Sequence, residues 1–253
     1  MGISRRLRDL AFAAAVALPV ADAAAADIAA VTDRGELLLL SDTKPGNAIR
    51  RGLHGQGFPL IGIDVRAADG VLYGVTPEGA ILAIDPVKGQ AFFKAMMSVA
   101  IEPAAGYVVD FNPVADRLRI VGAGGQNLRV DVGTGATIVD GRISGSVPGG
   151  PTAGAYTNAV AGAPATQLFV IAGGAYALQD PPNEGVLRPV GTAGIAADGM
   201  DFLFDGARNH GWAVAGNVLY TLDPATGATA PIGPIGAAAV GRIVDIAVLP
   251  PRR

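Results

Sequence analysis

The stretch YVVDFNPVADRLRIVGAGGQNLRVDVGTGATIV, from Tyr107 to Val139, decides the fold. It contains four short strand patterns separated by turns, over Tyr107 to Phe111, Arg117 to Val121, Asn127 to Asp131 and Ala136 to Val139. Versions of this stretch recur along the chain. That recurrence predicts a repeat architecture, because self-similarity at a fixed period is typical of arrays of one supersecondary unit.

Aspartates at strand ends mark the repeat. One series is Asp64, Asp110, Asp201 and Asp245, and a second is Asp85, Asp131, Asp180 and Asp223. The first two members of each series lie 46 residues apart, and the last two lie 44 and 43 residues apart, respectively. A further apolar strand pattern lies between the two acids of each unit, and another follows the second acid. Four strands in about 45 residues are typical of a propeller blade.

The two ends of the chain complete the repeat. Units begin near Leu60, Gly106, Ala153 and Gly199, which makes four. The segment from Asp27 to Asp42 resembles the later strands of a unit, and Val240 to Leu249 resembles a first strand. We therefore predict an all-β fold, a five-bladed β-propeller of four-stranded blades closed by pairing of the N- and C-terminal strands. The alternatives are an open solenoid or a β-sandwich. Almost no helix is expected.

The N-terminus has the pattern of a secretory signal. Ser4 to Arg8 is basic, Leu10 to Val20 is apolar, and Ala24, Ala25 and Ala26 offer small-residue cleavage sites. A transmembrane anchor needs roughly 20 apolar residues and finds about half that number here. We predict a signal peptide at 1–26, a single propeller domain at 27–253, and a periplasmic or extracellular location with no membrane span after cleavage. General secretion is favoured over the twin-arginine route.

Composition excludes several classes of protein. The formal net charge is −3 with no basic run, so no nucleic-acid partner is expected. The chain has 0 cysteines, which excludes disulfides, thiolate metal sites and a cysteine nucleophile. No Gly-x-Ser-x-Gly or His-Glu-x-x-His motif is present, so two common hydrolase classes are not indicated.

Several motifs point to a known family. The stretch FNPVADRLRIVGAGGQNLRVDVGTGA (Phe111 to Ala136), with AYTN (Ala155 to Asn158), QDPPNEGVL (Gln179 to Leu187) and RIVDIAV near the end, resembles the bacterial exported domain-of-unknown-function family DUF4394. The resemblance covers essentially the whole chain after the signal. It implies an exported, propeller-like domain and supplies no activity, cofactor or site residue.

The first series of aspartates is the candidate site. If their strands line the central channel, the carboxylates of Asp64, Asp110, Asp201 and Asp245 converge near the axis. They then form a candidate metal site for Ca²⁺ or Mg²⁺, with Tyr156, Thr157 and Asn158 contributed by the blade that lacks an acid. The alternative is that each carboxylate accepts backbone N–H bonds at its own strand or from the adjacent blade. We favour this structural interpretation, because buried polar groups are usually satisfied locally.

Three arginines form a second candidate. Arg117, Arg119 and Arg129 alternate on neighbouring strands and are expected on one sheet face. They could bind an anion through their planar guanidinium groups. A solvated outer face, paired with Asp116 or Asp131, is the interpretation we favour.

The sequence predicts a non-enzymatic binding or scaffold module whose channel mouth or loops hold a small molecule, glycan or protein. The alternative is a divalent-metal-assisted hydrolase of lactones or esters, in which the aspartate ring holds the ion. A second alternative is a structural component of a cell-surface assembly. We expect a monomer. A binding module calls for aromatic side chains at the loop face, for which the candidates are Phe58, Tyr107, Tyr156 and Trp212.

Overall fold

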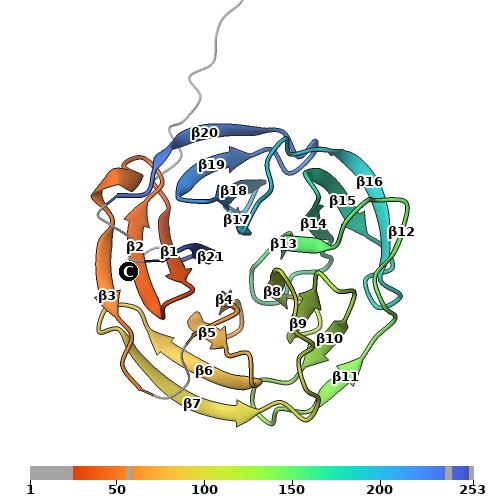
Figure 1. Cartoon of the computed structure of the whole chain (residues 1–253), viewed down its shortest axis with the longest axis horizontal. Helices are drawn as coiled ribbons and strands as arrows, with labels where there is room; N and C mark the ends of the chain where they lie inside the picture. The colour runs from red at the N-terminus through yellow and green to blue at the C-terminus, as the bar shows by residue number, and fades with distance from the viewer. Residues whose placement is uncertain (1–24, 56–58, 237–240, 251–253) are drawn as a thin grey trace, which may run out of the picture.

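Five sheets surround a common axis in the computed structural model of the chain, which describes residues 25–55, 59–236 and 241–250 (Figure 1). Each sheet is one blade, with its first strand nearest the axis and its last strand at the rim. The predicted five-bladed propeller is therefore confirmed. The predicted signal peptide falls almost entirely on residues 1–24, which lie outside the described residues, as does Phe58.

Blade 1 contains β21 (Ile243–Val248), β1 (Asp27–Thr32), β2 (Glu36–Ser41) and β3 (Ile49–Gly52). Blade 2 contains β4 (Gly62–Arg66), β5 (Val71–Val75), β6 (Ala80–Asp85) and β7 (Gln90–Met96). Blade 3 contains β8 (Tyr107–Asn112), β9 (Arg117–Gly122), β10 (Asn127–Val130) and β11 (Thr137–Val139). Blade 4 contains β13 (Pro151–Tyr156), β14 (Leu168–Ala172), β15 (Ala175–Gln179) and β16 (Val186–Thr192). Blade 5 contains β17 (Gly199–Phe204), β18 (Asn209–Ala215), β19 (Val218–Leu222) and β20 (Thr229–Pro234).

Blade 1 joins the two ends of the chain. The inner strand β21 pairs antiparallel with β1, and Ile28 lies opposite Val248 while Ala30 lies opposite Ile246. The predicted closure is confirmed in these strands. Pairing of this kind covers strand edges that an open array would expose.

Apolar side chains fill the space between neighbouring blades. Between blades 2 and 3, Tyr73 and Val75 of β5 pack in one buried cluster with Val109 and Phe111 of β8. The rings of Tyr73 and Phe111 meet edge to face, with centroids 5.4 Å apart. This is the favourable geometry for aromatic pairs, and it couples one blade to the next.

Glycines let the inner strands approach each other at the axis. A Cβ atom built on Gly199 of β17 would lie 2.6 Å from the Cα atom of Asp245 on β21. A Cβ atom on Gly62 of β4 would lie 2.7 Å from Oδ2 of the same aspartate. Any larger residue at these positions would push the inner strands apart, since separations below 3 Å leave no room for a carbon atom.

Two short elements depart from the predicted pattern. Strand β12 (Ser144–Gly145) adds a parallel pair to the rim of blade 4 beside β16. A 3₁₀ turn, η1 (Pro45–Asn47), lies between β2 and β3 and is the one helical element among the described residues.

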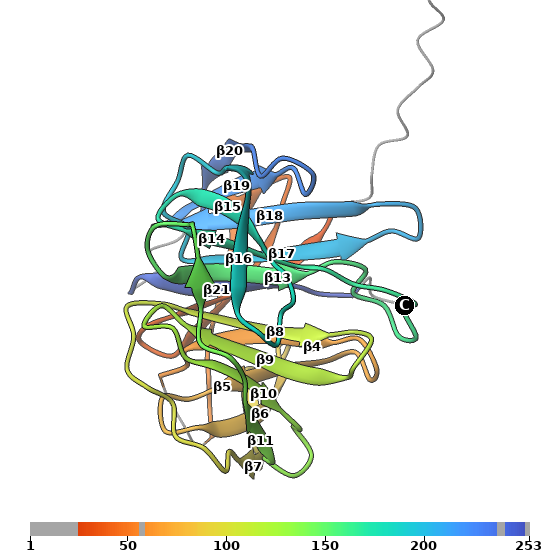
Figure 2. The same cartoon turned by 90° about the vertical axis from the view of Figure 1, so that its right-hand side faces the viewer.

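Figure 2 shows the propeller from the side. In the described part of the chain, no helix has the length and apolar character needed to cross a bilayer.

Candidate functional site

The four predicted aspartates all lie on inner strands. Asp64 is on β4, Asp110 on β8, Asp201 on β17 and Asp245 on β21, and each is at most 6% exposed. Burial removes a carboxylate from water, so each of these groups needs hydrogen bonds, a proton or a cation to compensate.

Backbone N–H groups of the neighbouring blade supply part of that compensation. The side chain of Asp245 accepts from Ile63 N at 3.0 Å, and that of Asp64 accepts from Phe111 N at 2.6 Å. In the same way Tyr156 N donates to Asp110 at 2.8 Å. The predicted structural role is present in these contacts, because each carboxylate connects its own inner strand to the next one.

The fourth such contact joins blades 5 and 1, where Val248 N donates to Asp201 at 2.6 Å. Asp64, Asp201 and Asp245 also accept from the residue that follows each of them, at 2.6, 2.6 and 2.9 Å. Asp110 differs, because the residue after it donates to Asp64 instead. Tyr156 is the one described residue that donates to Asp110, and it bonds a single oxygen, Oδ1.

The junction between β13 and β17 is built without a carboxylate. Asn158 N donates to Oδ1 of Asn209 at 2.7 Å, and Nδ2 of Asn209 donates to Oδ1 of Asn158 at 3.0 Å. At the other end of the strands, Oγ1 of Thr152 donates to the carbonyl of Ala197 at 2.6 Å. Neutral side chains therefore hold this pair of blades together.

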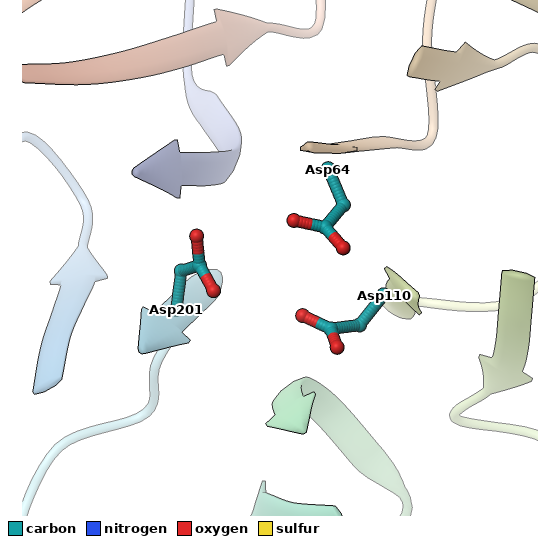
Figure 3. Close-up of side chains that lie close together, drawn as sticks. All are labelled: Asp64, Asp110 and Asp201. Atoms are coloured by element: carbon teal, nitrogen blue, oxygen red, sulfur yellow. The ribbon is translucent and has the colours of Figure 1, made fainter. Parts of the chain in front are cut away.

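Three of the four aspartates converge on one point. Figure 3 shows the carboxyl groups of Asp64, Asp110 and Asp201 pointing toward one another from three strands. One oxygen from each lies within 4.8 Å of the other two. Asp245 is outside this group.

The other predicted ligands of the ring bond elsewhere. The hydroxyl of Tyr156 accepts from Nε of Arg119, and Oγ1 of Thr157 accepts from Gln167 N. Asn158 is paired with Asn209 as described above. Blade 4 therefore sends none of these side chains to the carboxylate group through the contacts seen among the described residues.

Burial and mutual repulsion shift the acidity of the group. Burial raises the pKa of Asp201 to about 7. Burial, reinforced by the charge of Asp201, raises the pKa of Asp64 well above its ordinary value. The pKa of Asp110 is also raised well above that value, by burial and then by the charges of Asp64 and Asp201. At neutral pH the cluster therefore favours a bound proton or cation, because a full set of bare carboxylates is unfavourable.

Burial likewise raises the pKa of Asp245. The bonds from Ile63 and Ile246 oppose this effect.

A pocket of about 260 Å³ opens at the end of the channel where the inner strands finish. Asp64 and Asp201 line it, together with the loop residues Ala159, Val160 and Ala161 of blade 4. Except for the two aspartates, its lining residues are apolar or glycine. We call this space the exit pocket.

A second pocket of about 270 Å³ lies at the opposite end, where the inner strands begin. Its lining includes Tyr107, Ala196 and Val244, and the ion pair between Arg242 and Asp198 stands at its edge. None of the four aspartates lines it. We call this space the entry pocket. Of the predicted aromatic candidates, Tyr107 lines it, whereas Tyr156 and Trp212 are buried.

The predicted arginine row divides into two environments. Arg117 pairs with Asp131 at 3.3 Å with its side chain 42% exposed, as expected for a solvated face. Arg119 is 1% exposed, so the prediction of a solvated position was wrong for this residue. Its guanidinium group contacts Asp140 at 2.6 Å, and it also donates to Asn127, Asn183 and the hydroxyl of Tyr156.

Arg129 completes the network around Asp140 with two hydrogen bonds, at 2.7 and 2.8 Å. The network connects blade 3 to the loop between β15 and β16 in blade 4. Asp140 and Asn183 were not predicted to contribute, because both lie in loops that the repeat pattern does not describe.

The comparisons agree with the predicted resemblance. The family model described as "Domain of unknown function (DUF4394)" matches residues 37–247, which is most of the chain. A search of curated proteins found no match.

Two solved structures are similar to this chain at low sequence identity. A chain of the "Crystal structure of Nidogen/Laminin Complex" is 12% identical, with a TM-score of 0.50 and coverage of 89% of this chain and 98% of that chain. A protein of unknown function from Bacteroides thetaiotaomicron is 15% identical, with a TM-score of 0.48 and coverage of 81% of this chain and 57% of that chain. At these identities the first likeness describes the fold alone.

Proposed function

Since the chain belongs to the DUF4394 family of domains of unknown function, we propose that it is a non-enzymatic binding module that holds a small ligand in the exit pocket. One observation carries the proposal. Two buried carboxylates line an otherwise apolar pocket, and a few convergent polar groups in an apolar cavity are typical of ligand sites.

The β13/β17 junction supports the proposal. There, neutral amide and hydroxyl groups hold two blades together, so the fold does not require carboxylates for that purpose. Retaining buried acids near the same axis carries a desolvation cost that a purely structural joint can avoid. A ligand-binding role explains why buried acids are kept despite their desolvation cost.

The test blocks each pocket in turn. Ala161 and Ala196 are exposed residues that line the exit and entry pockets, respectively. A set of small anionic, cationic, neutral polar and apolar fragments is screened by ligand-observed NMR against the wild type, Ala161→Trp and Ala196→Trp. We expect at least one fragment to bind the wild type and Ala196→Trp but not Ala161→Trp. Binding that is indifferent to Ala161→Trp refutes the proposal.

A divalent-metal site is the second candidate, and the convergence of Asp64, Asp110 and Asp201 favours it. Ca²⁺ and Mg²⁺ prefer oxygen ligands of this kind. In that case the ion would polarise an ester or lactone carbonyl and lower the pKa of a bound water, as in metal-assisted hydrolysis. Native mass spectrometry with and without chelator tests it. An unchanged mass and melting temperature after chelation would exclude the ion and the hydrolase with it.

A structural role in a cell-surface assembly is the third candidate. Phe92, Phe93 and Met96 on the outer strand β7 are each at least half exposed, which favours a contact surface on blade 2. Sedimentation of the wild type and of Phe93→Ser over a range of concentrations tests it. Association by the wild type alone would support the role, and a monomer throughout would oppose it.

Export is also part of the proposal, and the N-terminal pattern of basic, apolar and small residues supports it. The test is cell fractionation followed by N-terminal sequencing. Recovery of a shortened chain from the periplasm or medium is expected, and an intact N-terminus in the cytoplasm would refute export.

A further inference from the structure

The walls of the exit pocket select against strongly hydrated ligands. The larger apolar residues of its lining come from three inner strands and the loop after β13: Val65, Val160, Phe202, Leu203, Phe204 and Val248. A volume of about 260 Å³ suits a small molecule with a short apolar body. Such walls gain free energy by covering hydrocarbon, and they offer no hydrogen bonds to a hydrated ion.

The acidic residues of the pocket select for positive charge. Asp64 and Asp201 line it, and Asp110 lies within 4.8 Å of both through one oxygen. Asp110 is 4% exposed, and Oδ2 of its carboxyl accepts no hydrogen bond from the described residues. In Figure 3 this carboxyl points toward the other two. Three carboxylates held this close together, two of them lining an apolar pocket, favour a cationic ligand that donates hydrogen bonds to them.

We propose that the exit pocket binds a small organic amine, whose ammonium group donates to Asp64, Asp110 and Asp201 while its apolar body lies against Val160, Phe202 and Phe204. The inference rests on the proposed binding function of the same pocket and names its ligand class. An ammonium group has three N–H donors, which matches three carboxylates.

The spacing of the carboxylates agrees with this ligand. Three oxygens placed about 2.8 Å from one tetrahedral nitrogen lie about 4.6 Å apart. The three oxygens here lie within 4.8 Å of one another. Adjacent ligands of Ca²⁺ at about 2.4 Å lie roughly 3.4 Å apart, which the same limit also admits. The apolar walls favour the amine, because an organic body gains free energy from covering them and a hydrated ion does not.

Three probes differ in charge, N–H donors and apolar body. Hexylamine has all three, hexanol keeps the apolar body without charge or N–H donors, and tetramethylammonium keeps the charge without N–H donors or a hexyl chain. Binding to the full chain at pH 7.5 is measured by isothermal titration calorimetry, and the melting temperature is followed in parallel. We expect hexylamine to bind at one site per chain. Hexanol and tetramethylammonium should bind at least about tenfold more weakly, because each loses hydrogen bonds to charged groups.

Two variants test whether hexylamine binds in the exit pocket. Asp110→Asn keeps an oxygen for Tyr156 N but places an amide beside the other carboxylates, so hexylamine should lose at least about tenfold in affinity. Ala161→Trp should abolish binding, and Ala196→Trp at the entry pocket should leave it unchanged.

Equal binding of hexylamine and hexanol, or full affinity in Asp110→Asn, would overturn the amine assignment. Failure of the amine assignment can be distinguished from failure of the proposed binding function. If another fragment binds in a way that Ala161→Trp blocks while hexylamine does not bind, the ligand class is wrong and the binding pocket stands. If Ca²⁺ binds and competes with hexylamine, with the same loss in Asp110→Asn, the cluster is a general cation site and the amine assignment fails. If no fragment responds to Ala161→Trp, both proposals fail.

Discussion

Two kinds of junction connect neighbouring blades of this propeller. At four of them an inner-strand aspartate accepts a backbone N–H from the next inner strand. At the fifth, between β13 and β17, amides and a hydroxyl perform the same task. The neutral junction carries no cost for burying charge, so it is insensitive to pH. The comparison teaches that blade cohesion alone does not account for the acids, and the following predictions test it.

The largest effect is expected at the junction of blades 3 and 4, which has the Arg119 network in addition to Asp110. Arg119→Met should lower the free energy of unfolding by about 3–5 kcal/mol, because Asn127 and Asn183 lose their buried donor and Asp140 keeps only Arg129. Urea denaturation measures the loss. Arg117→Met is the matched control, two residues away on the same strand, and should change the free energy by less than about 0.5 kcal/mol since its ion pair is exposed. Equal losses in the two variants would contradict this account.

The second effect is a fall in stability with rising pH. The pKa of Asp201 is about 7 in the folded chain and about 4 when unfolded, so the folded state holds the proton more tightly. Its stabilising contribution is therefore complete below pH 4 and is lost as pH rises to about 7. Each such group contributes a slope of about 1.4 kcal/mol per pH unit at most.

The exposed carboxylates paired with arginine, such as Asp116 with Arg66, have a lowered pKa and act in the opposite direction below pH 4. Denaturation at pH 5 and pH 8, in the absence of amines and divalent cations, checks the expectation. A chain that is as stable at pH 8 as at pH 5 would show that the carboxylates are not repelling one another.

The neutral junction is expected to respond differently. Asn209→Ala removes both hydrogen bonds to Asn158 and should cost about 1–3 kcal/mol, equally at pH 5 and pH 8. The same two denaturation curves, compared with the wild type, measure this. A loss that depends on pH would mean that the amide pair is coupled to the acids and that the two kinds of junction are not independent.

The smallest effect has the opposite sign. Asp110→Asn should raise the free energy of unfolding by about 1 kcal/mol at pH 8, because its amide can donate to Asp64 or Asp201 and one repelling charge is removed. Asp64→Asn is the control and should be destabilising, since both oxygens of Asp64 accept backbone N–H groups. Destabilisation by Asp110→Asn would show that its second oxygen has a structural role.

The fold was predictable because each repeat has its own strand and turn pattern within a short stretch of sequence. Alternating apolar residues, aspartates at strand ends and Gly-rich turns recur about every 45 residues, and complementary strands at the two ends indicated closure. The inward position of the four aspartates followed from the same pattern. The separation of Asp245 from the other three did not follow from it, because the distances between the carboxylates depend on side-chain positions that the repeat pattern does not describe.

The burial of Arg119 could not be predicted either. Its partners Asp140 and Asn183 come from loops outside the repeat, and Arg117, two residues earlier, has the same residue type and remains exposed. The exit pocket depends likewise on the loop of blade 4 that contains Ala159 and Val160, whose path no periodicity describes.

The pairing of β1 with β21 sets the order in which the molecule can be assembled. β1 is the first described strand to leave the ribosome and β21 is the last, so blade 1 cannot gain its innermost strand until the other four blades have been synthesised. Domains that fold during translation complete their units as the chain emerges. Here Asp245 also arrives with β21, so its contact with β4 forms in the same late step. The five sheets therefore cannot close into a complete ring until β21 is released.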